Sequence, residues 1–328
     1  MVSIASVIQR ALVQSAPLLF GSTGEILTEK SGHLNLGTAG TMYVGGICGV
    51  IGAFFYERSI PDGGTLNPFL AIIIPLICSI IGSLIMGLIY CFLTVTLRAN
   101  QNVTGLALTT FGTGIGNFFG GSLVKLVDSD VASVNFSRTS ELYRAYLPFA
   151  DNLGWFGQIF LSHGFLFYLG IVLAIISTFV LNKTAKGLNL RAVGENPATA
   201  DAAGIRVNVY KYVATCVGSI ISGLGGLYYV MEIGNWSNDG FGDRGWLAIA
   251  LVIFAVWKPN LAILGSILFG GLYIAHIFIP NISASVSELI KMLPYAVTII
   301  VLIVTSLRRK RENQPPAHLG LSYFREER

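Results

Sequence analysis

The sequence predicts an all-α polytopic membrane protein with about nine transmembrane helices, in a range of about eight to ten. The first observation is composition: of 328 residues, 53% are hydrophobic and 12% charged, whereas soluble globular domains are about 25% charged. The second is two long stretches that lack Asp, Glu, Lys and Arg, between Asp62 and Arg98 and between Lys258 and Glu288. The third is 38 glycines, which let helices approach closely in lipid.

Nine stretches are apolar over roughly the 20 residues that a membrane span needs. They are 5–23, 36–56, 69–97, 103–121, 163–182, 211–232, 244–257, 260–279 and 289–307. Two of them depart from the usual length. The stretch 69–97 is either one tilted helix or a helix with a re-entrant piece. The stretch 244–257 is short enough to be a half-helix that is buried within protein.

The basic residues set the orientation, because Lys and Arg accumulate on the cytoplasmic side of a membrane protein. A basic run at 308–311 follows the last predicted span, which predicts a cytoplasmic C-terminus. Counting back makes loop 183–210 cytoplasmic, loop 122–162 external, and the short N-terminus external. The predicted organisation is therefore a transmembrane domain, 1–307, followed by a basic cytoplasmic tail, 308–328. Loop 122–162 either docks an outside partner or is merely tolerated, and 153–161 is expected to form an interfacial helix.

Catalytic equipment is missing from the sequence. It contains no GxxxxGK[ST] phosphate-binding loop, no HExxH and no GxSxG, so we expect no ATP hydrolysis by this chain and no enzyme activity. The cysteines have no metal-ligand spacing, and we expect no metal or cofactor on this chain. The glycines of 112–121 and 218–226 have the small-xxx-small spacing of packed helices. These four cysteines and four histidines are isolated: Cys48, Cys78, Cys91, Cys216, His33, His163, His276 and His318.

Charged side chains are absent from the middle of every predicted span. Secondary transporters usually keep an ionisable residue there for ion coupling, so the pattern disfavours an ion-coupled secondary transporter. That class stays as the alternative, because backbone carbonyls and hydroxyls alone can hold Na⁺. The pattern also disfavours a channel with a charged filter.

Loop 183–210 contains a helix that its connecting role does not require. Asn196 is a good N-cap residue and Pro197 suits the first helical position. Gly204 stands where a glycine ends a helix. The sequence thus predicts about two helical turns in a cytoplasmic loop, which we interpret as a docking element for a cytoplasmic partner. The predicted docking residues are Gly194, Glu195, Asn196, Pro197, Asp201 and Gly204.

Polar residues stand at the mouths of three predicted spans, in the segments 34–40, 98–110 and 240–246. Such groups either pair across helices or line a wet path for a polar solute, because an unpartnered amide or hydroxyl is costly in a bundle. In the third segment, Asp243 and Arg244 either pair with each other or mark the outer mouth. The predicted path residues are Asn35, Asn102, Thr104, Thr110 and Trp246.

Four blocks of the sequence resemble a known family. The blocks EKSGHLNLGTAG, LRANQNVTGLAL, LRAVGENPATADAAGI and GDRGWLAIALVIFAVWKPNLAILGS are similar to diagnostic segments of ABC importer permeases of the branched-chain amino acid and simple-sugar class. Within that class, the chain most resembles nucleoside and simple-sugar permeases that work with basic-membrane-protein-type binding lipoproteins. The resemblance covers residues 15–307.

The resemblance implies an assembly in a bacterial plasma membrane. Two homologous permeases, different or identical, would pair and rest on cytoplasmic ATPase subunits that bind ATP and Mg²⁺, and an external lipoprotein would deliver the solute. It places Asp201 where the family signature has Glu, a departure that leaves the docking role intact. The implied solute is a nucleoside first and a simple sugar second. The implied mechanism is alternating access, in which no bond is made. The resemblance implies no nucleic acid partner.

Overall fold

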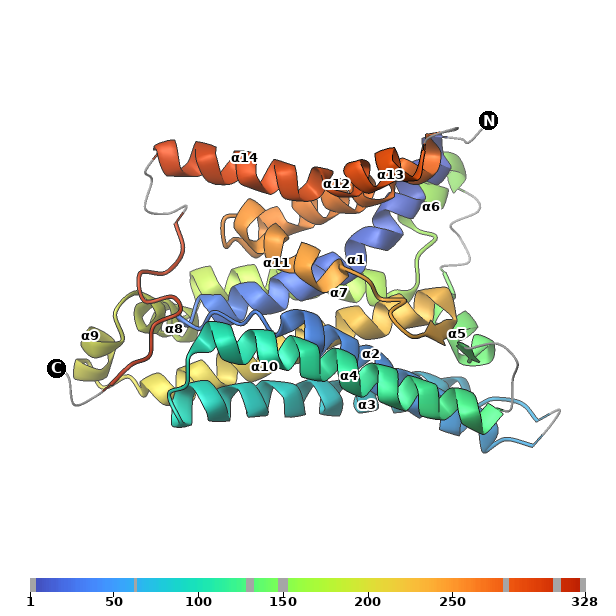
Figure 1. The fold of residues 1–328 in the computed structure, drawn as a ribbon, viewed down its shortest axis with the longest axis horizontal. Coiled ribbons are helices and arrows are strands. Elements are labelled where there is room, and N and C mark those ends of the chain that lie inside the picture. Colours follow the sequence, from blue (N-terminus) through green and yellow to red (C-terminus); the bar gives the residue numbers. More distant parts are fainter. Residues whose placement is uncertain are drawn as a thin grey trace.

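The computed structural model describes residues 4–61, 64–127, 133–146, 153–279, 283–308 and 314–324. Within these residues the fold is a bundle of long helices that run roughly along one axis (Figure 1). Helix α1 (Ile4–Glu29) lies in the interior and packs against α10 (Val207–Ile233) and α12 (Pro259–Phe278). Helix α10 also packs against the second and third helices of the chain.

The first half of the chain supplies three further long helices. They are α2 (Thr38–Arg58), α3 (Pro68–Cys91) and α4 (Gln101–Val127). Helix α3 begins behind Asn67, whose side chain accepts a hydrogen bond from Phe69 N, and it continues without a break into a π-helical turn, η1 (Phe92–Thr96). The stretch 69–97 is therefore one long helical segment, and the predicted alternative of a re-entrant piece is wrong.

The second half contains α7 (Phe165–Lys183), α11 (Arg244–Phe254), α13 (Ala284–Lys291) and α14 (Leu293–Arg308) in addition to α10 and α12. Helix α11 has 11 residues, which at 1.5 Å per residue is about 16 Å and too short to cross a bilayer. The predicted half-helix is thus confirmed. The last predicted span is split at Met292, just before Pro294, because proline has no N–H to continue the helix.

Helices lie over all nine stretches that the sequence predicts as apolar spans. Among the described residues, six helical segments are long and apolar enough to cross a membrane: Thr38–Arg58, Pro68–Thr96, Phe165–Lys183, Val207–Ile233, Pro259–Phe278 and Ser285–Val304. Helices α1 and α4 have 26 and 27 residues, or about 40 Å, which also exceeds the roughly 30 Å of hydrocarbon. The chain is an all-α polytopic membrane protein.

Shorter elements gather at the two ends of the bundle. At one end, β1 (Ser133–Asn135) pairs antiparallel with β2 (Asn235–Ser237), near α5 (Ser137–Arg144) and α6 (Gly154–Phe160). The helix predicted at 153–161 is α6, whose Trp155 is 69% exposed, and its place at the membrane interface stays a prediction. The other end carries α8 (Ala185–Glu195) and α9 (Pro197–Ala202) and is called the α9 end below (Figure 1). Helix α8 was not predicted.

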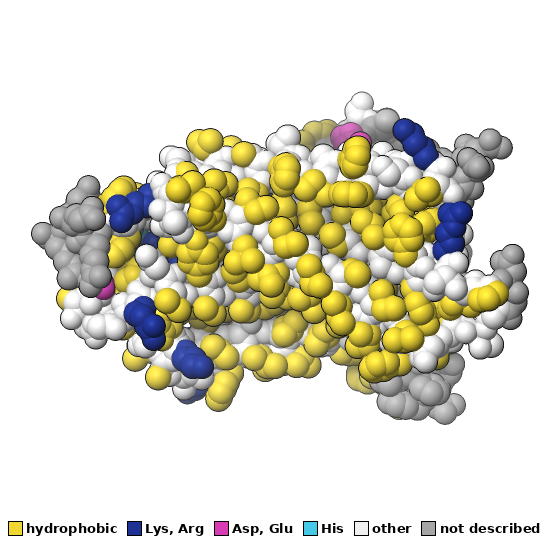
Figure 2. Space-filling model, turned by 90° about the horizontal axis from the view of Figure 1, so that it is seen from below, with side chains coloured by type: hydrophobic (Ala, Val, Ile, Leu, Met, Phe, Trp, Pro, Cys, Tyr) yellow, Lys and Arg dark blue, Asp and Glu magenta, His cyan; other side chains and the backbone are white. Residues whose placement is uncertain are grey.

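The glycines of α2 and α10 bring the two backbones together. A Cβ atom at Gly45 would lie 2.5 Å from Gly223 Cα, closer than carbon atoms approach. The predicted packing role is confirmed for Gly112 and Gly116 on α4, whereas Gly114 and Gly121 have open space beside them. Apolar side chains that are not buried cover the outside: Figure 2 shows them spread across the face seen from below, with Lys and Arg toward its two ends. Ile77, Ile81 and Ile85 of α3 are each about half exposed.

Candidate functional site

Helix α9 is fixed by its own sequence. Asn196 has an extended backbone, and its Oδ1 accepts a hydrogen bond from Thr199 N at 3.0 Å. Pro197 occupies the first helical position, where no N–H is needed. Gly204 has φ +82°, a left-handed conformation that glycine adopts without strain. The predicted helix and both of its capping residues are confirmed.

The predicted docking residues divide into supporting and exposed positions. Gly194 and Pro197 are buried, whereas Glu195, Asn196 and Gly204 are exposed and Asp201 is half-buried. Gly194 must be small because a Cβ there would collide with Lys30 O. Below α9, a small apolar cluster of Val193, Ala200 and Val207 joins α8, α9 and the start of α10. Helix α9 therefore packs on one side against α8 and the start of α10, and its other side is exposed.

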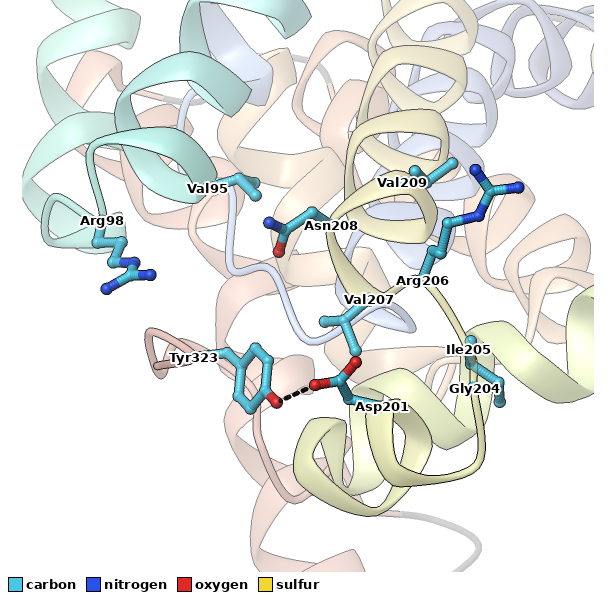
Figure 3. Close-up of a pocket in the computed structure, with 10 residues that line it drawn as sticks. All are labelled: Val95, Arg98, Asp201, Gly204, Ile205, Arg206, Val207, Asn208, Val209 and Tyr323. Atoms are coloured by element: carbon cyan, nitrogen blue, oxygen red, sulfur yellow. Dashed lines mark hydrogen bonds between the residues drawn. The ribbon is translucent and has the colours of Figure 1, made fainter. Parts of the chain in front are cut away.

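A groove of about 380 Å³ borders α9 on that open side. It is lined by Arg98 after α3, by Asp201 and by residues 204–209, and Tyr323 closes it from the C-terminal segment (Figure 3). The hydroxyl of Tyr323 donates a hydrogen bond to Asp201 Oδ2 at 2.9 Å. Arg98 has φ +58°, and its guanidinium lies 4.8 Å from the ring centre of Phe324.

The turn between α1 and α2, residues 30–37, lies directly beside this element. Gly32 approaches Gly194, and the turn is tied to α4 by a hydrogen bond from Leu34 N to Gln101 Oε1 at 2.9 Å. His33 is 1% exposed and hydrogen-bonded through Nδ1 to Thr215 Oγ1 of α10 at 3.1 Å. Burial, with the nearby Lys211 and His318, lowers the pKa of His33 well below its usual range. The turn thus connects α1, α4 and α10 close to α9.

Two buried carboxyl groups correct the sequence interpretation. Helix α1 continues six residues beyond its predicted end at 23, and it carries Glu25 and Glu29 into the packed interior, where they are 1% and 3% exposed. Glu25 accepts hydrogen bonds from Asn35 N and from the Thr38 hydroxyl. Glu29 accepts one from Trp257 Nε1, after α11. These acids lie in the last two turns of α1, so buried ionisable groups are present although the middle of the helix has none.

The predicted path residues are in two different environments. Asn35 is 3% exposed, and its Oδ1 accepts a hydrogen bond from Gly37 N, so it shapes the turn. Thr104 is 7% exposed and bonds to Asn100 O. Asn102 and Thr110 are exposed on α4, and Trp246 on α11 is half-buried. Asn35 and Thr104 are therefore enclosed by protein in this structure, while the other three are exposed or partly exposed.

The three segments that carry these residues converge at the start of α2. Thr109 of α4 donates a hydrogen bond to Leu36 O at 2.8 Å, and Gly40 of α2 lies against Leu108 O. On the other side, a Cβ at Gly245 of α11 would collide with Ala39. Three segments that are far apart in the chain thus lie in contact around the start of α2: 34–40, 98–110 and 240–246.

Arg244 at the start of α11 does not use Asp243 as its partner. Its guanidinium bonds to Gln14 Oε1 of α1 at 3.2 Å and to Phe241 O at 2.7 Å. The same group lies 4.1 Å from the ring centre of Tyr229, a cation–π distance. Arg244 therefore fixes α11 to α1 and α10 instead of pairing with Asp243.

The contacts of the C-terminal segment with the α9 end are what sequence reasoning missed. Residues 314–324 were expected only as part of a basic tail, yet His318 N bonds to Gly194 O at 3.0 Å and Gly320 N to Gly32 O at 3.2 Å. The signal available in the sequence was Pro315, Pro316 and Gly320, which are turn-forming residues in an otherwise polar tail. Their presence does not say which surface the turn contacts.

Comparison with known proteins adds a family and relatives. Residues 7–302 match the family described as branched-chain amino acid transport system / permease component. The chain is 33% identical over 301 residues to NupC, a nucleoside ABC transporter permease protein of Lactococcus lactis, a match that covers 90% of each chain. It is 30% identical over 310 residues to NupQ, a guanosine ABC transporter permease protein of Bacillus subtilis, over 92% of each.

A third relative is named for a different solute. TsgC13 of Haloferax volcanii carries a provisional name as a glucose ABC transporter permease protein, and it is 30% identical over 270 residues, 82% of this chain and 76% of TsgC13. No solved structure matches the chain significantly. The matched range includes α9, the turn 30–37 and the helices that surround them.

Proposed function

The chain belongs to the branched-chain amino acid transport system permease family, and from that premise we propose that it carries nucleosides across the membrane. It is a multi-pass permease subunit of an ABC importer. Two relatives named for nucleoside or guanosine transport match nine-tenths of its length, which supports nucleosides as the solute. TsgC13 makes simple sugars the second candidate.

The observation that carries the mechanism is α9, a capped helix that stands on a packed base at one end of the bundle. We propose that it docks on a separate ATPase subunit, which binds ATP and Mg²⁺. Glu195 and Asn196 would meet that subunit directly, since they are exposed, whereas Gly194 and Pro197 would support them. Movement of the ATPase would then be transmitted to α8 and α10, between which α9 lies.

We also propose that the chain crosses the membrane nine times, with α11 as a half-length pass and the α9 end in the cytoplasm. One pocket at that end is lined by Lys30 after α1, Leu181 of α7, Lys258 before α12 and Gln314 after α14. These helix ends therefore share one side of the molecule. The arrangement supports a cytoplasmic C-terminal segment on the same side as α9, because that side is rich in Lys and Arg.

The solute path is proposed along Asn102, Thr110 and Trp246, which are exposed or partly exposed on α4 and α11, the two helices that flank the start of α2. A second homologous permease would close this side, and an external binding lipoprotein would deliver the solute at the α5 and α6 end. Alternating access would follow from differential contacts in two states, with no bond made or broken.

Docking is tested by crosslinking. Glu195→Cys and Thr199→Cys place thiols on the exposed side of the α9 element, and both should crosslink to cysteines introduced on the ATPase in the assembled transporter. Glu141→Cys on α5, at the other end, is the matched control and should not crosslink. If neither α9 variant crosslinks in a fully assembled complex, the docking role is wrong.

Transport is tested in proteoliposomes that contain both permeases, the ATPase and the binding protein. Guanosine uptake should require ATP and should be blocked by excess adenosine but not by glucose. Uptake that follows a proton or Na⁺ gradient and ignores ATP would contradict the proposal and favour the ion-coupled alternative, for which Glu25 and Glu29 would then be the first residues to test.

A further inference from the structure

Residues 314–324, called the tail segment here, lie along the α9 end and touch three separate parts of the protein. His318 N bonds to Gly194 O at 3.0 Å, at the junction of α8 and α9. Gly320 N bonds to Gly32 O at 3.2 Å, in the turn before α2. Gln101 Nε2, at the start of α4, bonds to Leu321 O at 3.1 Å. The tail segment therefore links the α9 element to the turn and to α4.

Side chains of the tail segment pack as well as hydrogen-bond. Leu319 lies against the main hydrophobic core, and the ring of Tyr323 lies against the cluster of Val193, Ala200 and Val207 beneath α9. The Tyr323 hydroxyl then reaches Asp201 Oδ2 at 2.9 Å, as Figure 3 shows. Tyr323 thus contacts the α9 element twice. Its ring packs against the apolar cluster, and its hydroxyl bonds to Asp201 in the last turn of α9.

These contacts give α9 a second route to the helices that border the proposed path. The first route is covalent, through α8 and α10. The second runs from Asp201 to Tyr323, along the tail segment to Gly320 and Leu321, and from there to the turn 30–37 and to Gln101. Helix α9 has 6 residues and is joined to α8 through Asn196 alone. Tyr323 adds a side-chain contact that constrains the position of α9.

We propose that the tail segment is part of the ATPase docking surface and that Tyr323 is a positioning residue for α9. The proposal rests on the proposed docking of α9 to the ATPase. In it, the ATPase contacts both α9 and the tail segment, and the tail segment passes the movement of α9 to the turn 30–37 and to α4. Loss of the Tyr323–Asp201 bond leaves the complex assembled but weakens the link between ATP hydrolysis and transport.

The first test is Tyr323→Phe in the full transporter in proteoliposomes, with uptake normalised to assembled complex and to ATP hydrolysed. The ring and its packing stay, and only the hydroxyl is lost. Because one hydrogen bond contributes on the order of 1 kcal/mol, uptake per ATP should fall roughly fivefold. Tyr168→Phe is the matched control: its hydroxyl bonds to Phe160 O at 3.0 Å, at the opposite end of α7 from loop 183–210, and uptake should stay at the wild-type value.

A double-mutant cycle localises the effect. Asp201→Ala should lower uptake per ATP, and adding Tyr323→Phe should lower it no further, because both changes remove the same hydrogen bond. Wild-type uptake per ATP in Tyr323→Phe, or losses that multiply in the double variant, would overturn the positioning role.

Hydrogen–deuterium exchange tests the surface itself. The amides of the tail segment should exchange more slowly when the ATPase is added to the permease pair, together with those of α9. Protection of α9 without protection of the tail segment would overturn this inference alone. If neither α9 nor the tail segment is protected and Thr199→Cys does not crosslink, the proposed docking of α9 is itself wrong, and the inference about the tail segment fails with it.

Discussion

Single residues at the α9 end have environments that the neighbouring sequence does not indicate. His33 belongs to no catalytic or metal-binding motif in the sequence, but in the structure it is buried against the ring of Tyr90 and bonded to Thr215. Trp257 has φ +54° and uses its indole N–H to satisfy Glu29. Each such group is buried with a partner from a distant helix, since a buried polar group without a partner is costly. These residues therefore connect helices more than they perform chemistry.

The neutral state of His33 predicts how stability changes with pH. Burial lowers the pKa of His33 well below the value near 6.5 of an unfolded histidine. Below pH 6.5 the unfolded chain binds a proton that the folded chain does not, so stability falls as the pH falls, by up to about 1.4 kcal/mol per pH unit. The titratable groups that face the ring and help to lower the pKa of His33 are Lys211 and His318.

The measurement is the thermal midpoint of the purified chain in detergent between pH 7.5 and 5.5. Wild type should lose stability through this range, and His33→Asn should lose less because it has no proton to bind. An identical pH dependence in both proteins would mean that His33 is not buried in its neutral form.

At the scale of elements, close helix contacts determine which glycines are replaceable. Gly45 faces the backbone of Gly223, which cannot rotate away, whereas a methyl group added at Gly114 on α4 would have no neighbouring atom within 4 Å. The small-xxx-small spacing is similar in both helices, so spacing alone does not distinguish them. Helix α2 is enclosed by other helices, and α4 has one face open.

Two alanine substitutions should therefore have opposite effects on stability. Gly45→Ala places a methyl group 2.5 Å from Gly223 Cα, and overpacking of this kind costs about 1–3 kcal/mol. Gly114→Ala meets no neighbour and should stabilise α4 by up to about 1 kcal/mol, because alanine favours helix over glycine. Thermal unfolding of the isolated chain in detergent measures both. Equal effects of the two substitutions would contradict the packing of α2 on α10.

At the scale of the molecule, the ends of the bundle differ in what they present. The α9 end carries the proposed docking element, the tail segment and a pocket lined by Lys30, Arg191 and Lys258. The opposite end carries the β1–β2 pair, α5 and α6. Between them, apolar side chains face outward, as expected where lipid or a second permease is the neighbour (Figure 2).

The sidedness of the molecule is testable with a membrane-impermeant maleimide. In intact cells Glu141→Cys should be labelled, whereas Thr199→Cys should be labelled only after the membrane is permeabilised. The unmodified chain, whose Cys48, Cys78, Cys91 and Cys216 are buried or half-buried, gives the background. Labelling of Thr199→Cys in intact cells would mean that the α9 end lies outside the cell and that the proposed topology is wrong.

Much of the fold was predictable from the sequence, because the signals are local. Nine apolar stretches all proved helical, and Asn196, Pro197 and Gly204 predicted α9 with its caps. A span depends on the hydropathy of about 20 consecutive residues, and a cap depends on residues within one helical turn. The family resemblance likewise rested on short blocks of consecutive residues.

Other features were decided only by tertiary structure. Three of them depend on segments that are distant in the chain. These are the burial of Glu25 and Glu29, the enclosure of Asn35 and Thr104, and the pairing of Val134 with Trp236. The tail segment is the clearest case, since Tyr323 and Asp201 are separated by 122 positions. The sequence alone determined a helical membrane permease with a capped helix at one end. The packing of helices against each other decided which polar groups are enclosed and which contacts support that helix, because such contacts arise from shape and distance rather than from the spacing of neighbours.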